Sequence, residues 1–246
     1  MEVRRPDSCV IVPTFGNAAT VGDVAHRVLA QGLPLIVVDD GSTDGTAAVL
    51  AGLPAEVTVL THSRNRGKGV ALKTGLEHAR KSGYRYAVTL DADGQHFPED
   101  LPVFLAAMAE HPGALIVGSR NLKAENMPGG STFANRFSNF WFRLQTARCL
   151  PDTQTGYRAY PLDRLPNLKL LTARYEAELS LLVFSAWRGV ELFPVPVRVW
   201  YPAPEERVSS FRPFRDFLRI SVLNTGLCLL ALVYGYPRML LHKLLR

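Results

Sequence analysis

Two carboxylates and an amide follow an apolar run in the middle of the chain. Residues 88–90 predict the end of a buried strand, and Asp91, Asp93 and Gln95 come directly after it. If the chain stays extended there, the spacing of two residues turns all three side chains to one side. Oxygens of this kind suit a hard divalent cation that also holds a diphosphate. The alternative is an ordinary turn, in which Asp and Gly are common without any ligand.

A second pair of acids ends an earlier predicted strand. Residues 35–38 are apolar and run straight into Asp39 and Asp40, which a Gly-rich turn then follows. In an open parallel sheet, ligands bind outside the carboxyl ends of the strands. An acid at this position can accept hydrogen bonds from the edge of a nucleobase. The alternative is that the two acids only cap a helix and form its preceding turn.

The elements that position these acids alternate between short apolar runs and amphipathic stretches. The strand pattern predicts strands at residues 8–13, 35–38, 57–60, 86–90 and 114–117. The helix pattern predicts helices at residues 20–31, 46–53, 68–82 and 99–110. Strands separated by helices of this length indicate an α/β fold with a mainly parallel sheet flanked by helices. In the second half we expect a loop at residues 123–131, helices at 133–147 and 172–188, and a strand at 191–199.

Charge and hydropathy set the last forty residues apart. The net charge of the chain is +6, and basic residues outnumber acids from residue 198 onward. Residues 220–237 carry no charge, a length just sufficient to cross a bilayer. Basic residues flank this run on both sides, so the sequence gives no orientation across a membrane. We expect residues 1–205 to form the catalytic domain and residues 206–246 to form a helical tail that associates with the cytoplasmic face of the membrane.

Two other roles for the tail follow from the same pattern. The apolar run could be a buried helix that packs on the domain. The basic residues could bind nucleic acid, but they flank an apolar helix and are not interleaved with aromatic side chains that stack on bases. We therefore expect no nucleic-acid partner.

Six ordered segments carry a family resemblance. They are residues 12–14, 38–46, 65–69, 91–96, 118–120 and 155–160, within a region of similarity from about residue 8 to residue 200. Together they resemble the family 2 glycosyltransferases, whose fold is the GT-A nucleotide-diphospho-sugar transferase fold. The chain is most similar to the dolichol and polyprenyl phosphate mannose and glucose synthases. Such a resemblance predicts the fold better than it predicts the acceptor.

The resemblance implies a metal-dependent, inverting transfer from a UDP- or GDP-linked sugar to a membrane lipid. It implies that Asp91, Asp93 and Gln95 hold Mg²⁺ or Mn²⁺, and that Asp93 binds the metal directly. It assigns the donor nucleotide-sugar to Pro13, Thr14, Asp39, Asp40, Lys68, Asp91 and Ala92. The predicted catalytic residues are Asp91, Asp93, Arg120 and Asp152. For Lys68, the alternative is a solvated lysine at the start of a helix.

The acceptor decides what other groups the site needs. A lipid monophosphate is largely ionised near neutral pH, since its second pKa is about 6, and it needs positioning by arginine more than it needs a base. The predicted acceptor-phosphate residues are Arg120, Arg136, Ser138, Arg207 and Arg212. Contact with the membrane surface is the alternative for Arg207 and Arg212.

If the acceptor is instead a hydroxyl group of another lipid or glycan, a carboxylate base must lie near it. Asp152, Glu176 and Glu178 are the candidate bases in the second half. Two rival classes remain. A sugar-nucleotide pyrophosphorylase should carry a basic, Gly-rich loop after the first strand, and residues 15–19 hold no basic residue. A non-catalytic binding subunit could lose the acids at residues 91 and 93, which this chain retains.

Overall fold

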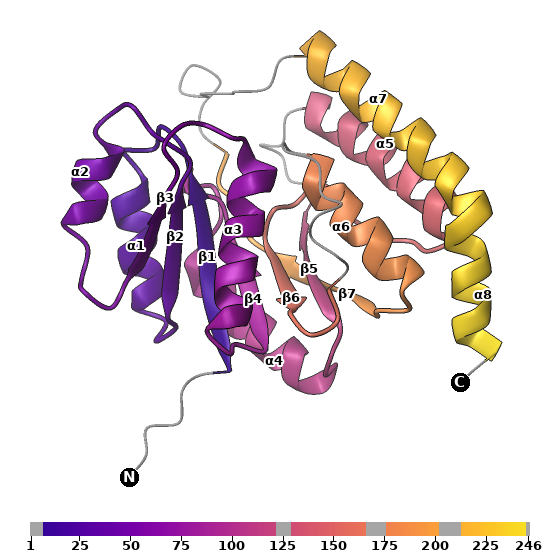
Figure 1. The fold of residues 1–246 in the computed structure, drawn as a ribbon, viewed down its shortest axis with the longest axis horizontal. Helices are drawn as coiled ribbons and strands as arrows, with labels where there is room; N and C mark the ends of the chain where they lie inside the picture. Colours follow the sequence, from indigo (N-terminus) through magenta and orange to yellow (C-terminus); the bar gives the residue numbers. More distant parts are fainter. Residues whose placement is uncertain (1–6, 122–128, 166–175, 202–212, 245–246) are drawn as a thin grey trace.

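The computed structural model describes residues 7–121, 129–165, 176–201 and 213–244, which form a seven-stranded sheet covered by helices on both faces (Figure 1). The order across the sheet is β3-β2-β1-β4-β6-β5-β7. The strands are β1 (Ser8–Thr14), β2 (Leu35–Asp39), β3 (Thr58–Thr61), β4 (Tyr86–Thr89), β5 (Leu115–Arg120), β6 (Arg158–Pro161) and β7 (Leu192–Val197). All neighbours pair in parallel except β6, which runs antiparallel to β4 and β5. The prediction of a mainly parallel sheet is confirmed.

The helices divide between the two faces of the sheet (Figure 1). They are α1 (Val21–Leu29), α2 (Thr46–Ala51), α3 (Lys68–Lys81), α4 (Leu101–Glu110), α5 (Gly129–Thr146), α6 (Glu176–Trp187), α7 (Pro213–Leu230) and α8 (Tyr236–Leu244). A short 3-10 helix, η1 (Pro98–Asp100), precedes α4, and a π-helical turn, η4 (Ala231–Gly235), joins α7 to α8. Helices α1, α2 and α4 pack on one face, whereas α3, α5, α6 and the end of α7 pack on the other.

The first strand shows why the sequence forms this three-layer arrangement. Every residue of β1 is buried, as expected for a strand covered on both sides. Cys9 and Ile11 join the core under α3 and α6, whereas Val10 and Val12 join the core under α1 and α4. Side chains alternate between faces along a strand, so one apolar run supplies both cores.

Strand β6 was not predicted from the sequence. It is four residues long and begins with Arg158, whose charge hides the apolar pattern, yet all four residues are buried. Strand β7 contains Pro194 and Pro196, which cannot donate backbone hydrogen bonds. Its place at the edge of the sheet, beside β5 alone, makes those prolines compatible with a strand.

The start of helix α5 differs from the prediction. Helix α5 begins at Gly129, so residues 129–131 are helical and the predicted loop is wrong there. Two adjacent glycines lower the helix propensity of this stretch, but propensity is a weak guide that packing overrides. Residues 123–128 of that loop, residues 172–175 of the predicted helix and the boundary between 205 and 206 lie outside the described residues.

The C-terminal helices pack on the domain along one side and are exposed along the other. Residues Ile220–Leu244 form a helical stretch that is long and apolar enough to cross a membrane, by length and composition. Only a minor part of this stretch is buried against the rest of the protein. On the packed side Asn224 is fully buried and accepts a 2.9 Å hydrogen bond from Gln145 of α5. Gly235 lies so close to the Trp187 ring that a Cβ there would be 2.4 Å from it. The tail is therefore docked on α5 and α6 along one side (Figure 1).

Candidate functional site

The carboxyl ends of β2, β1 and β4 lie side by side in the sheet. They bring the predicted donor residues to one end of the sheet, which is the edge formed by the carboxyl ends of its parallel strands. Thr14 pairs with Asp39 at the ends of β1 and β2. The acidic segment begins two residues after the end of β4, which neighbours β1 on its other side. Parallel pairing thus collects residues that are far apart in the sequence.

The acidic segment itself turns instead of continuing the strand. Residues 92–94 form a turn, with Gly94 at a φ of +75°, so the side chains of Asp91, Asp93 and Gln95 do not share a side through strand alternation. The expectation of an extended segment is wrong because Asp93 Oδ1 accepts a 3.0 Å hydrogen bond from the backbone N–H of Gln95 and closes the turn. Thr20 also holds the segment by donating a 2.6 Å hydrogen bond to the carbonyl of Ala92.

The two aspartates carry negative charge that the protein does not fully compensate. The Asp93 side chain reaches solvent, but the surrounding protein still desolvates it. This desolvation and the nearby charge of Asp91 raise the pKa of Asp93 to about 6. Among the described residues, no group of three or more His, Cys, Asp or Glu side chains is arranged to hold a metal ion. Two adjacent carboxylates whose repulsion favours a bound cation, with an amide at Gln95, fit a partly hydrated Mg²⁺ or Mn²⁺.

Lys68 lies between two acids at the start of α3. Its Nζ is 2.6 Å from Asp91 Oδ1 and 3.2 Å from Glu178 Oε2. Burial alone would raise the pKa of Asp91, but the charge of Lys68 outweighs it and holds that pKa below its ordinary value. Lys68, whose side chain is 19% exposed, is therefore an ion-paired partner of the acidic segment, and the alternative of a solvated lysine is wrong.

The other predicted donor residues have distinct surroundings. Asp39 Oδ1 accepts hydrogen bonds from the backbone and hydroxyl of Ser42, at 3.0 and 2.6 Å. Asp40 is saturated, because its oxygens accept from the backbone N–H groups of Arg66 and Gly67 and from His62. Asp40 thus holds the loop that leads into Lys68.

Thr14 is buried at the end of β1 beside Pro13 and contacts Asn17 Oδ1 at 3.1 Å. Both residues shape the wall of the sheet edge next to Asp39.

A second ion cluster lies at the carboxyl end of β5. Arg120 donates from Nε and Nη2 to the two oxygens of Asp152, at 2.6 and 3.0 Å. Asp152 also accepts hydrogen bonds from Asn135 Nδ2, at 2.5 Å, and from the backbone of Gln154, at 3.0 Å. Burial would raise the pKa of Asp152, but these hydrogen bonds and the charge of Arg120 hold it below its ordinary value. No pattern in the sequence indicates that Asn135 belongs to this cluster.

The remaining acceptor candidates are only partly brought together. Arg136 is exposed on α5, whereas Ser138 is buried and bonds the hydroxyl of Thr153 at 2.7 Å. Ser138 therefore fixes the loop beside Asp152. Arg207, Arg212 and the side chain of Glu176 lie outside the described residues.

Two further residues near the acidic segment were not predicted as site residues. His96 is buried against the Tyr157 ring, and this burial lowers its pKa to about 4, so the imidazole is neutral at pH 7. Gly156 approaches the Lys68–Asp91 pair so closely that a Cβ there would lie 3.0 Å from Asp91 Oδ2 and 3.1 Å from Lys68 Nζ. Both residues belong to segments that carry the family resemblance, and that is the signal that could have identified them.

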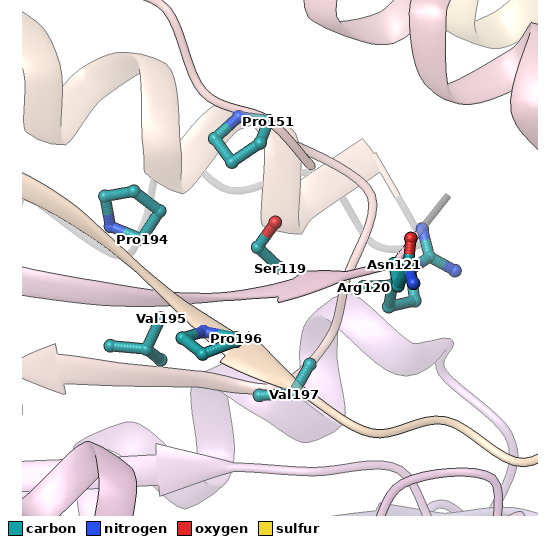
Figure 2. Close-up of a pocket in the computed structure, with 8 residues that line it drawn as sticks. All are labelled: Ser119, Arg120, Asn121, Pro151, Pro194, Val195, Pro196 and Val197. Carbon is teal, nitrogen blue, oxygen red and sulfur yellow. The ribbon is translucent and has the colours of Figure 1, made fainter. Parts of the chain in front are cut away.

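An apolar cavity of about 390 Å³ opens beside the second cluster. Its lining residues are Ser119, Arg120, Asn121, Pro151, Pro194, Val195, Pro196 and Val197. Figure 2 shows the Ser119 side chain pointing to the side of β5 and β7 on which Pro151 and Pro194 lie, with Arg120 and Asn121 at one end. The cavity thus joins an apolar wall to the Arg120–Asp152 pair.

Comparisons with known proteins agree with this geometry. The family model described as glycosyl transferase family 2 matches residues 9–160. The UDP-N-acetylglucosamine–dolichyl-phosphate N-acetylglucosaminyltransferase of Methanococcus voltae is 28% identical over 240 residues, which are 88% of this chain and 96% of that protein. The undecaprenyl-phosphate mannosyltransferase of Micrococcus luteus is 30% identical over 199 residues, which are 76% of this chain and 81% of that protein.

One solved structure extends the comparison to the fold. Glucosyl-3-phosphoglycerate synthase from Mycobacterium tuberculosis, in complex with Mn²⁺, UDP-glucose and phosphoglyceric acid, superposes with a TM-score of 0.59 at 19% identity. The match covers 91% of this chain and 79% of that one, and it supports the GT-A fold. Because the family model spans more than half of the chain, this protein belongs to glycosyl transferase family 2 and is a glycosyltransferase.

Proposed function

We propose that the protein transfers a sugar from a nucleotide-sugar to polyprenyl phosphate at the cytoplasmic face of a membrane, with a divalent cation and inversion at the anomeric carbon. The observation that carries this proposal is the Asp91–Asp93 pair, which meets Thr14 and Asp39 at one edge of the sheet. The similarity to transferases named for dolichyl phosphate and undecaprenyl phosphate supports the acceptor class.

The donor half of the site is built for a leaving diphosphate. Asp39, which keeps one oxygen outside its turn, is placed to accept from a nucleobase or ribose beside Pro13 and Thr14. Asp91, Asp93 and Gln95 would hold Mg²⁺ or Mn²⁺, which neutralises the charge that develops on the diphosphate. Lys68 adds a positive charge at the same end of the sheet, where it pairs with Asp91.

The acceptor half favours a phosphate over a hydroxyl group. A hydroxyl acceptor needs a base with a free lone pair, but Asp152 is fully buried and both of its oxygens already accept hydrogen bonds. An ionised phosphate attacks without losing a proton, so it needs only cations to orient it. Arg120 and the exposed Arg136 supply them, and the apolar cavity beside Arg120 offers a wall for the first carbons of the lipid.

The exposed side of the tail supplies the contact with the membrane. Large apolar side chains are exposed together on α5, α7, η4 and α8, namely Phe140, Leu144, Val222, Leu229, Leu232, Val233, Leu240, Leu241 and Leu244. Because the opposite side of the tail is locked to Gln145 and Trp187, we propose that the tail lies in the membrane surface while docked on the domain.

Labelled nucleotide-sugars test this proposal directly. The purified protein is incubated with polyprenyl phosphate and a panel of UDP- and GDP-sugars, with Mn²⁺ or Mg²⁺ and with a chelator control. We expect cation-dependent label in the lipid fraction from one donor. Slow cation-dependent hydrolysis of a donor without lipid labelling would contradict the phosphate acceptor and retain the glycosyltransferase.

A further inference from the structure

A fully buried arginine lies beneath the two halves of the site. Arg158 donates from Nη1 to the carbonyl of Glu178, at 2.6 Å, and from Nη2 to the carbonyl of Thr153, at 2.9 Å. Its side chain is completely buried, and none of the ion pairs found within the described residues includes it. A buried cation that bonds main-chain carbonyls, and forms no ion pair with an acid among the described residues, is costly, so its place in the fold calls for a functional explanation.

The contacts of Arg158 lead to the donor side through Glu178. This acid is in the first turn of α6, where the helix dipole favours a negative charge, and its backbone carbonyl is fixed by Arg158. The Glu178 carboxylate bonds Lys68, and Lys68 bonds Asp91. Gly156 leaves the space in which the last two groups meet. A continuous chain of contacts therefore joins the start of α6 to the acidic segment.

We propose that Glu178 is a positioning residue for sugar transfer: it holds the Lys68 ammonium against Asp91, and Arg158 holds Glu178. This inference rests on the proposed function, because it concerns the donor side of the same site. The charges of Asp91 and Glu178 balance those of Lys68 and the nearby Arg158, so ionised Asp93 leaves a net charge of −1, which favours a cation nearby. Glu178 also keeps Lys68 in place when a diphosphate, a competing anion, arrives.

This role differs from that of a general base for a hydroxyl acceptor. The Glu178 carboxylate is almost entirely buried, with its side chain 9% exposed, and it is paired with a lysine. A base would have to reach the acceptor, whereas Glu178 reaches only a residue that itself touches the donor side. Its effect on the reaction is therefore transmitted through Lys68 and Asp91.

The test compares charge and shape at residue 178. Glu178→Gln keeps the size of the side chain and removes its charge, and Glu178→Asp keeps the charge on a shorter side chain. The affinity for Mn²⁺ is measured by electron paramagnetic resonance of the free ion, in the presence of UDP or GDP, and steady-state transfer is measured separately. We expect Glu178→Gln to weaken Mn²⁺ binding and to lower kcat, each by roughly tenfold, as is typical for partners of ligand residues. Glu178→Asp should restore most of the Mn²⁺ affinity.

Glu77→Gln is the matched control. Glu77 also pairs with a lysine on α3, at 3.8 Å from Lys73, but it is 43% exposed and lies outside the site. The control should leave Mn²⁺ binding and kcat within about twofold of the wild-type values, as expected for an exposed pair. The thermal midpoint of each variant separates loss of fold from loss of positioning.

The outcomes separate the two proposals. If wild-type protein binds Mn²⁺ and transfers sugar while Glu178→Gln matches it within twofold, the positioning role is wrong and the proposed function stands. The same conclusion holds if Glu77→Gln has the same effect as Glu178→Gln, because the effect is then general electrostatics. If the wild-type protein neither binds Mn²⁺ nor transfers sugar, the proposed function is wrong, and the positioning role that rests on it is wrong as well.

Discussion

The two ion clusters at the edge of the sheet differ in how completely they balance their charges. The donor cluster places one ammonium, Lys68, between Asp91 and Glu178, and Asp93 adds a third carboxylate. The acceptor cluster pairs Arg120 with one described acid, Asp152, and both oxygens of that acid are satisfied. A cluster with excess negative charge can still take up a cation, whereas a balanced and saturated pair mainly holds its members in place.

This difference assigns separate work to the two clusters. Removing an acid from the donor cluster should impair chemistry and leave the fold intact. Removing the buried acid from the acceptor cluster should leave the half-buried Arg120 without its partner and destabilise the fold.

Asp93→Asn should lower the rate of transfer by at least about 100-fold, because a bound cation contributes several kcal/mol to stabilisation of the leaving group. Transfer is measured at saturating donor with Mn²⁺ present. Asp23→Asn is the control, since Asp23 is an exposed acid on α1 whose partner is Arg27. Unchanged activity of Asp93→Asn would contradict a role for a cation bound in the donor cluster.

Asp152→Ala should lower the free energy of unfolding by about 3–5 kcal/mol. This is the typical cost of removing one member of a buried ion pair and leaving the other without a partner. Asp93→Asn should raise it slightly, because ionised Asp93 is disfavoured by its surroundings. Both values come from chemical denaturation at pH 7. Equal effects of the two substitutions would contradict the contrast between the clusters.

Asp93 and Asp152 should change the stability of the fold in opposite directions as the pH rises. The folded chain holds the proton of Asp93 more tightly than the unfolded chain, so this group destabilises the fold as the pH rises from about 4 to 6. Asp152 has a lowered pKa, so its contribution to stability is present at neutral pH and is lost on acidification. Denaturation of the Asp93→Asn and Asp152→Ala variants across this range separates the contributions.

Cation binding should weaken by up to about tenfold for each pH unit below 6, because a proton then competes for Asp93. The measurement is a Mn²⁺ titration without donor or acceptor, so that no substrate phosphate titrates in the same range. Asp93→Asn provides the comparison, and its residual binding should not change near pH 6. Constant wild-type affinity from pH 5 to pH 7 would contradict the prediction.

Val233→Glu should reduce binding to phospholipid vesicles several-fold, because Val233 is 76% exposed on the apolar side of the tail. Transfer to a short-chain, water-soluble polyprenyl phosphate should stay close to the wild-type rate. Co-sedimentation with vesicles measures the binding. The control is Val103→Glu on α4, because Val103 is exposed on the opposite face of the sheet.

The first half of the fold and the position of the site could be predicted from the sequence. Apolar strands, such as residues 35–38, end directly in acids, and parallel pairing must then bring those ends together. The antiparallel strand β6 could not be predicted, because its first residue is an arginine that only tertiary contacts make tolerable inside the core. Local pattern carries no information about such distant partners.

The same limit applies to individual site residues. Asp39 and Asp40 are adjacent at a strand end, yet their hydrogen bonds differ. Both oxygens of Asp40 accept from the loop at residues 62–67, whereas Oδ1 of Asp39 accepts from a local turn. Spacing predicts where a carboxylate is but not which donors reach it. For that reason Asp152 could be named as a base from the sequence, although its lone pairs are already occupied by Arg120 and Asn135.

The most direct test of the central claim is anomalous diffraction at the manganese edge from crystals grown with Mn²⁺ and UDP or GDP. The account predicts one strong anomalous peak about 2.2 Å from a carboxylate oxygen of Asp93, within the donor cluster. A peak at the Arg120–Asp152 pair, or no peak while the nucleotide is bound at the edge of the sheet, would contradict it.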